Sequence, residues 1–237
     1  MASKTVFTLS KKVSPVHVSF DMTGKMLLIN GISTSPLCNK YCQARVKNPE
    51  MICAHCFSIA SQWKKGLREN LIENSALLND HIFTDDEIPI LWSPSFMFRF
   101  ESYGDLQTEI QAANYFKFAE KNPGLHFALW TKNPWIIENM MKTYGIKKPA
   151  NLRIIGSSYL LNKPMTDYYK KFDFIDNVFT VYSLEYAKEH NIRITCGARS
   201  CFHCEKCYIG THEQYEINEL LKADANKARK IGFSIDD

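Results

Sequence analysis

The sequence predicts an α/β fold arranged as a partial (β/α)6 barrel, and three observations support this prediction. Short apolar or β-branched runs recur along the chain. A segment with helical periodicity follows each of them, which is typical of parallel strands joined by right-handed crossovers. The length of 237 residues suits a single α/β unit, and a hydrophobic content of 45% is enough for a core.

Each expected strand is a short run of β-branched, aromatic or other apolar residues. The first run, MLLIN, is a candidate to pair in a hairpin with the preceding segment Val16–Phe20, and the second, FMFRF, is rich in aromatic residues. The six strands are expected at Met26–Asn30, Phe96–Phe100, Leu125–Trp130, Leu152–Ile155, Val178–Tyr182 and Ile192–Thr195.

Helical periodicity separates these runs and closes the chain. The longest segment, Phe57–Asp80, places apolar residues at spacings near three and four, which predicts one buried face. Asp105 suits the N-cap of a helix that begins at Leu106, and Pro134 suits a first helical position after an Asn133 cap. Helices are expected at Phe57–Asp80, Leu106–Glu120, Trp135–Thr143, Lys163–Lys171, Leu184–Glu189 and His212–Lys230.

No boundary or repeat divides the chain, so residues 1–237 are expected to form a single α/β domain. Residues 1–25 are its N-terminal extension or hairpin, and residues 196–237 carry a C-terminal cysteine cluster and helix. The net charge is +4, with basic pairs spread along the chain, which supports a nucleic-acid partner only weakly. No signal peptide and no run of about 20 apolar residues is visible, which predicts a cytoplasmic protein without a membrane partner.

All eight cysteines fall into two groups of four near opposite ends of the sequence. The first group reads C-x3-C-x10-C-x2-C and begins after the first expected strand, whereas the second reads C-x4-C-x2-C-x2-C and begins after the sixth. The first cysteine group is Cys38, Cys42, Cys53 and Cys56, and the second cysteine group is Cys196, Cys201, Cys204 and Cys207.

These spacings indicate metal binding. A short C-x2-C loop points two sulfurs to the same side, so that both thiolates can bind one metal centre. In a reducing compartment, clustered cysteines are more often metal ligands than disulfides. The crowded second group resembles ferredoxin-type sites, which favours one or two iron–sulfur clusters of the [4Fe-4S] type, with zinc as the alternative.

Polar residues at the ends of other strands are candidate ligand contacts, since ligands of α/β folds gather at the carboxyl ends of the strands. Glu101, Gly104 and Asp105 follow the second expected strand, where Glu101 could bind a ligand ammonium group. Lys132 follows the third strand and is placed to hold an anionic group. Ser157 follows the fourth strand, in a small polar stretch that suits close approach of a ligand to the backbone.

The order of these features resembles the bacteriophage gene product 88 family, whose members are similar in layout to radical-S-adenosylmethionine proteins. The resemblance spans most of the chain, from about residue 27 to residue 208. It is carried by Leu37–Arg45, Cys53–Ser58, Trp63 with Asn70 and Leu77–Leu78, Arg99–Asp105 with Tyr115, Phe127–Lys132, and Thr195–Cys207.

The resemblance implies a barrel of the radical-S-adenosylmethionine type, in which a [4Fe-4S] cluster reductively cleaves S-adenosylmethionine. It further implies that Glu101 binds the ammonium of this cofactor, that the second cysteine group holds an auxiliary cluster, and that an electron donor is a partner. Enzymes of that class bind their cluster through C-x3-C-x2-C, and the first group has one cysteine more. If three of its cysteines bind, one iron stays open for the cofactor, and if all four bind, none does.

Two other functions are compatible with the pattern, and neither the sequence nor the resemblance names a substrate. Both clusters could be structural or could relay electrons to a partner without catalysis. Alternatively, four thiolates around zinc would form closed structural sites in a nucleic-acid-binding module, which the mild positive charge allows.

Overall fold

The computed structural model describes residues 16–20, 24–61, 64–197, 200–210 and 215–235, and its centre is a seven-stranded sheet. The strands lie side by side in chain order. The first two are antiparallel, and every later pair is parallel. The strands are β1 (Ser19–Phe20), β2 (Asn30–Ile32), β3 (Met97–Phe100), β4 (His126–Thr131), β5 (Leu152–Ser157), β6 (Asn177–Tyr182) and β7 (Glu216–Leu220).

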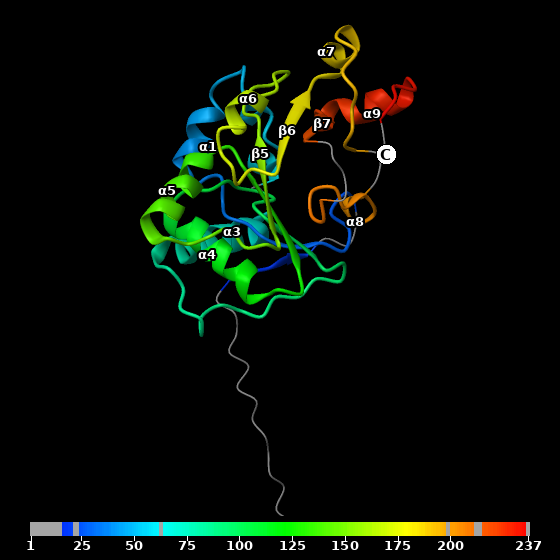
Figure 1. The fold of residues 1–237 in the computed structure, drawn as a ribbon. Coiled ribbons are helices and arrows are strands. Elements are labelled where there is room, and N and C mark those ends of the chain that lie inside the picture. The colour runs from blue at the N-terminus through cyan, green and yellow to red at the C-terminus, as the bar shows by residue number, and fades with distance from the viewer. Residues whose placement is uncertain (1–15, 21–23, 62–63, 198–199, 211–214, 236–237) are drawn as a thin grey trace, which may run out of the picture.

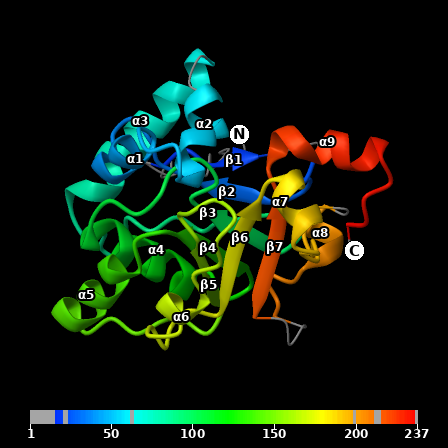
Figure 2. The same ribbon diagram turned by 90° about the horizontal axis from the view of Figure 1, so that it is seen from above.

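Helices connect the parallel strands, and several of them lie along one side of the sheet. Figure 2 shows α3, α4, α5 and α6 on this outer side and α8 on the opposite, inner side. Among the described residues, no helix is both long and apolar enough to cross a membrane. The helical elements are α1 (Lys40–Arg45), a 3₁₀ helix (Ile52–His55), α2 (Phe57–Ala60), α3 (Lys65–Asp80), α4 (Glu109–Lys121), α5 (Pro134–Tyr144), α6 (Thr166–Tyr169), α7 (Leu184–Glu189), α8 (Cys201–Cys204) and α9 (Lys222–Lys230).

Aromatic side chains fill the core between the sheet and the outer helices. Phe98 and Phe100 of β3 are fully buried there, together with Phe127 of β4 and Tyr115 of α4. The ring of Phe100 stacks on those of Tyr115 and Phe127, with centroids 4.3 and 5.0 Å apart. This apolar layer holds α4 against the sheet and thereby positions the loop between β3 and α4.

The inner face of the sheet packs against the C-terminal segment 201–208, which contains α8 (Figure 1). The guanidinium of Arg99 lies over the Trp130 ring on this face, 3.9 Å from the ring centroid. Two cysteines of the second group, Cys201 and Cys207, therefore pack against the inner face of the sheet. The buried apolar residues of this inner-face cluster are Ile29, Met97, Ala128, Ile155 and Tyr208.

The α/β fold with a mostly parallel sheet is confirmed, and β3 to β6 lie where the sequence predicts strands. The first parallel strand is shifted, because residues 25–28 form turns and β2 begins only at Asn30. Leu28 in these turns has a φ of 64°, which a strand cannot contain. The predicted hairpin is confirmed by the pairing of Ser19 with Gly31.

The last strand lies elsewhere than the sequence predicts. Ile192–Thr195 is not a strand, since Ile194 forms only an isolated bridge. Instead, β7 lies inside His212–Lys230, which the periodicity predicts as a single helix. Only its second half is helical, as α9, and residues 212–214 are outside the described part of the chain.

Two predicted helices are shorter than expected. The segment Phe57–Asp80 is divided into α2 and α3, and residues 62–63 between them are outside the described residues. The segment Lys163–Lys171 contains only the short helix α6.

One predicted cap is wrong and one helix start is confirmed. The helix α4 begins three residues later than expected, and its N-cap is Thr108, whose Oγ1 accepts the Gln111 N–H at 3.1 Å. Asp105 is therefore not an N-cap. Pro134 begins α5 as predicted, although the Asn133 side chain makes no capping hydrogen bond.

Candidate functional site

The first cysteine group lies on the loops and short helices that follow β2. Cys38 is exposed in the turn after this strand, and Cys42 lies in α1. Cys53 lies in the 3₁₀ helix, and Cys56 directly precedes α2. Because Cys42, Cys53 and Cys56 are partly buried, three thiols of the group are sheltered and the fourth is not.

Asn39 ties the first cysteine loop to the end of β3. Its Oδ1 caps α1 by accepting the N–H groups of Tyr41 at 2.9 Å and Cys42 at 3.4 Å. Its Nδ2 donates to the carbonyl oxygens of Asp105 at 2.8 Å and Leu106 at 3.3 Å. Since Asn39 is buried, these bonds fix the position of Cys42 relative to the neighbouring strand.

The three sheltered thiols lie within electrostatic reach of one another and of a lysine. Burial raises the pKa of Cys42, and the nearby Asp105 carboxylate adds to this increase. Cys53 and Cys56 raise the pKa of Cys42 further, whereas Lys132 lowers it. Burial lowers the pKa of Lys132 itself, but the charges of Cys53, Asp105 and Cys42 produce a net increase. Lys132, at the carboxyl end of β4, therefore supplies positive charge to the thiols.

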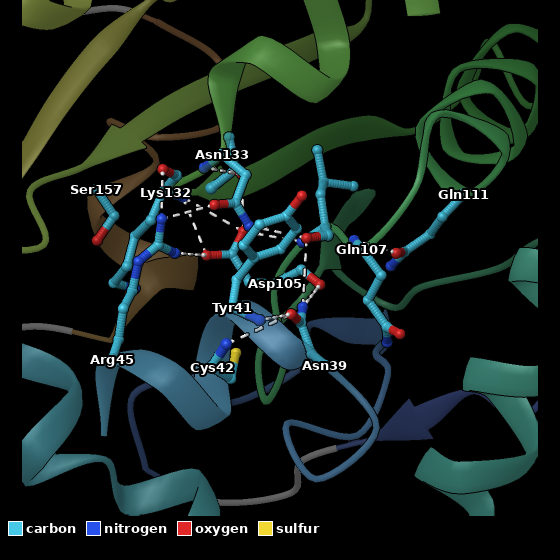
Figure 3. A network of polar contacts seen from close by, with 12 residues as sticks. Asn39, Tyr41, Cys42, Arg45, Asp105, Gln107, Gln111, Lys132, Asn133 and Ser157 are labelled. Atoms are coloured by element: carbon cyan, nitrogen blue, oxygen red, sulfur yellow. Dashed lines mark hydrogen bonds and ion pairs between the residues drawn. The ribbon is translucent and has the colours of Figure 1, made fainter. Parts of the chain in front are cut away.

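Arg45, at the end of α1, brings a second positive charge to the same place (Figure 3). Its Nη2 donates to Asn133 Oδ1 at 2.7 Å, and its Nη1 lies 3.8 Å from Asp105 Oδ2. The Nη1 atom is buried and makes no hydrogen bond among the described residues, so its charge is balanced by the Asp105 carboxylate while its N–H can still donate to an anion. The guanidinium carbon lies 6.0, 5.9 and 5.7 Å from the ring centroids of Tyr41, Trp135 and Tyr159.

Asp105 joins the ends of β3 and β4. Its Oδ1 accepts the Thr131 hydroxyl at 2.7 Å and the Leu106 N–H at 2.8 Å. Its Oδ2 accepts the Lys132 N–H at 3.1 Å. Asp105 is only 2% exposed, so it positions the backbone that carries Lys132.

The fold thus brings three of the predicted ligand contacts to one place. Asp105, Lys132 and Ser157 follow or end three neighbouring strands and lie together in Figure 3 with Cys42. Arg45 belongs to the same group, although its sequence pattern predicts no role for it. Its place three positions after a cysteine is the one sequence feature that points to the site, and basic residues are common on solvated helices.

Glu101 and Gly104 lie in a buried network between β2, β3 and α4. Glu101 is 3% exposed, and its carboxylate accepts hydrogen bonds from the Thr34 hydroxyl at 3.0 Å, from Gln111 Nε2 at 2.6 Å and from the Tyr115 hydroxyl. A Cβ at Gly104 would lie 2.4 Å from Glu101 Oε2, so only glycine fits there. Burial raises the pKa of Glu101 to about 7, against the hydrogen bonds from Tyr115 and Thr34. These donors all belong to the protein, and binding of a ligand ammonium by Glu101 stays a prediction.

The second cysteine group lies beside β7 and the inner face of the sheet. The backbone of Cys196 forms an isolated β-bridge with Glu219 of β7. Cys201 and Cys204 begin and end α8, and Cys207 follows in a turn. Burial raises the pKa of Cys196 to about 11 and also raises those of Cys201 and Cys207. Neighbouring cysteines of the group add to each increase, so these thiols also lie within electrostatic reach of one another.

Two cations accompany the second group as well. Lys25 Nζ donates to Cys196 Sγ at 3.0 Å and forms an ion pair with Glu219. Arg99 lowers the pKa of the Cys201 thiol, and its Nε is buried without a hydrogen-bond partner among the described residues. Each cysteine group therefore has one lysine, one arginine and one buried guanidinium N–H that is free to donate.

The lysine and arginine beside each group carry charge opposite to that of a metal–thiolate centre. Thiolates around a metal carry net negative charge, and a buried charge needs a compensating partner. All eight cysteines are free thiols. In the described ranges, no three His, Cys, Asp or Glu side chains are gathered closely enough to hold a single metal ion. Coordination of one ion would therefore require these side chains to move.

Lys222, the first residue of α9, lies between the two cysteine groups. Its Nζ is 3.3 Å from the centroid of the Phe57 ring, and Phe57 directly follows Cys56. The pKa of Lys222 is lowered, mainly by burial of its ammonium and also by Arg99 and Lys25 of the second group. The charge of Glu219 and, to a smaller extent, that of Cys56 from the first group act on the same ammonium in the opposite direction. The ammonium of Lys222 therefore interacts electrostatically with residues of both cysteine groups.

Comparison with known families agrees with this order of motifs along the chain. The sequence profile described as Gene product 88 matches residues 10–236. No curated protein and no solved structure matches the chain. Because the match covers nearly the whole length, the chain belongs to the Gene product 88 family.

Proposed function

We propose that the protein holds an iron–sulfur centre at each cysteine group. The buried arginine beside each group supports this proposal most directly, because Arg45 Nη1 and Arg99 Nε have no hydrogen-bond partner in the described chain. Leaving such a donor unpaired costs on the order of 1–3 kcal/mol, and an anion that accepts its hydrogen removes this cost. A cluster held by thiolates is such an anion, and Lys132 and Lys25 supply further positive charge.

Iron–sulfur clusters fit these cysteines better than zinc. In a [4Fe-4S] cluster each thiolate binds a different iron atom, whereas the four sulfurs of a zinc site must converge on one ion. The crowded C-x2-C-x2-C run of the second group is typical of ferredoxin-type clusters. The second centre would be closed if all four thiolates bind, which suits electron transfer or structural support. Their charges act on one another, and Cys201 and Cys207 pack against the inner face.

The first centre is suited to catalysis because its three sheltered thiols leave one ligand position open. Cys42, Cys53 and Cys56 would hold the cluster, and the exposed Cys38 would not bind it. Bound there, the cluster would supply the electron that cleaves S-adenosylmethionine, as in radical-S-adenosylmethionine enzymes. Lys132, fixed by Asp105, would bind the carboxylate of that cofactor.

The topology of the sheet supports the same proposal. Six parallel strands follow one another in chain order, which is the arrangement of a partial (β/α)6 barrel. Asp105, Lys132 and Ser157 lie after or at the carboxyl ends of its strands, where such barrels bind ligands. Such a reaction would require an external electron donor as a partner, and a substrate would bind in addition to S-adenosylmethionine.

Protein purified without oxygen is expected to be brown and to contain iron and acid-labile sulfide, about eight of each per chain if both clusters are [4Fe-4S]. Its visible absorbance is expected to bleach when dithionite is added. Iron, sulfide and zinc are to be measured on the same sample. Stoichiometric zinc without iron or sulfide would overturn the proposal in favour of closed zinc sites.

The catalytic part of the proposal predicts that the reduced protein forms 5′-deoxyadenosine from S-adenosylmethionine. Lys132→Met is expected to weaken the apparent affinity for S-adenosylmethionine about tenfold, because a charged contact to its carboxylate is lost. Lys142→Met, an exposed position on α5, is the matched control and is expected to have no effect. Intact clusters that form no 5′-deoxyadenosine would instead identify a non-catalytic electron-transfer protein.

A further inference from the structure

A cavity of about 300 Å³ opens between β7, α9 and the loop that carries Cys196. Its volume is at the lower end of the range found for small-molecule sites, so a small metabolite would fit. The polar and charged residues of its wall are Lys25, Cys196, Ser200, Glu219, Lys222 and Arg229.

The wall of this cavity has an excess of positive charge. Its one carboxylate, Glu219, forms an ion pair with Lys25. Across the described residues, neither Lys222 nor Arg229 forms an ion pair. Lys222 lies over an aromatic ring, and the Nη2 of Arg229 donates to the Gly197 carbonyl at 3.4 Å. Neither of these two cations is therefore held by an ion pair, although the charge of Glu219 also acts on Lys222.

The start of α9 adds to this positive potential. The helix begins at Lys222, no side chain caps its first N–H groups, and Ala225 of the first turn lines the cavity. A helix N-terminus carries partial positive charge that favours anions. The one acidic residue of this turn, Asp224, is engaged elsewhere, because its Oδ2 accepts the Leu184 N–H at 3.0 Å.

We propose that this cavity binds a small organic anion with a carboxylate or phosphate group. Lys222 and Arg229 hold the anionic group beside the start of α9. Because Cys196 is part of the wall and Lys222 lies beside Phe57, the bound anion lies between the two cysteine groups. The role of this anion as a substrate rests on the proposed iron–sulfur function. The binding of an anion in the cavity does not depend on that function.

Isothermal titration calorimetry with inorganic phosphate, and separately with malonate, tests this proposal on the full-length protein purified without oxygen. The protein is expected to bind at least one probe at a single site, and the stronger probe identifies the preferred anionic group. The double variant Lys222→Ala/Arg229→Ala is expected to bind that probe at least about tenfold more weakly, because two charged contacts are lost.

The double variant Lys188→Ala/Lys230→Ala is the matched control, since it removes the same charge from exposed positions outside the cavity wall. It is expected to retain the wild-type affinity. Equal weakening in both double variants, or no binding of either probe, would overturn the proposal. Iron is measured in the same samples. Normal iron content without anion binding would contradict only the proposed anion site. Anion binding without iron would contradict only the proposed iron–sulfur function.

Discussion

Replacing Cys201 and Cys207 together with serine is expected to remove about half of the iron and sulfide, because two thiolates are too few to hold the second cluster. The cluster at the first group is expected to remain. Arg99 then loses the anion beside its unpaired Nε, whereas Lys25 keeps its ion pair with Glu219, so the midpoint of thermal unfolding is expected to fall as well. Iron and sulfide assays and circular dichroism melting curves measure both effects.

The control for this experiment is Cys38→Ser, which changes an exposed member of the first group. It is expected to retain all iron, since Cys42, Cys53 and Cys56 suffice for a three-thiolate centre. Loss of about half of the iron in Cys38→Ser would show that four thiolates close the first centre and leave no open position. Unchanged iron in the double variant would contradict the second centre.

Ionisation of Glu101 is expected to lower the free energy of unfolding by about 3 kcal/mol as the pH rises from 4.5 to above 7. Burial raises the pKa of this carboxyl in the folded protein to about 7, from an ordinary value of 4.5. Between these values the folded protein keeps a proton that the unfolded chain has released. The stabilisation by Glu101 is therefore complete below pH 4.5 and is lost as the pH rises through 7.

The variant Glu101→Gln isolates this effect, because glutamine cannot titrate. The difference in unfolding free energy between wild type and Glu101→Gln is expected to change by up to about 3 kcal/mol across the pH range, in favour of the variant at high pH. Denaturant titrations at several pH values measure this difference. Glu120→Gln, at an exposed position of α4, is expected to follow the wild type. Parallel profiles for wild type and Glu101→Gln would contradict the prediction.

The central strands are predictable from the sequence because parallel strands buried on both faces are nearly continuous apolar runs. This holds for β3 to β6. It fails for β7, whose sequence EINEL contains only two apolar residues and runs almost directly into α9. The start of β2 is also missed, because the apolar residues before Asn30 form turns that pack on the inner face instead of pairing.

The position of a candidate ligand residue is predictable when topology alone decides it. Asp105, Lys132 and Ser157 come together because the carboxyl ends of parallel strands meet at one edge. The role of Glu101 depends on a φ of 58° at the end of β3 and on donors from Thr34 and other distant residues. Such contacts between residues far apart in the sequence leave no local pattern, and the same is true of Arg45 beside the thiols.

The covering of the inner face by segment 201–208 has a consequence for how the protein emerges from the ribosome. Strands β2 to β6 leave the exit tunnel before this segment does, so Met97, Ala128 and Ile155 stay in contact with water until it arrives. A chain terminated before Cys201 would present these side chains as a bare apolar surface, and such surfaces aggregate. Nonsense mutations late in the gene are therefore expected to yield insoluble polypeptide rather than a smaller working protein.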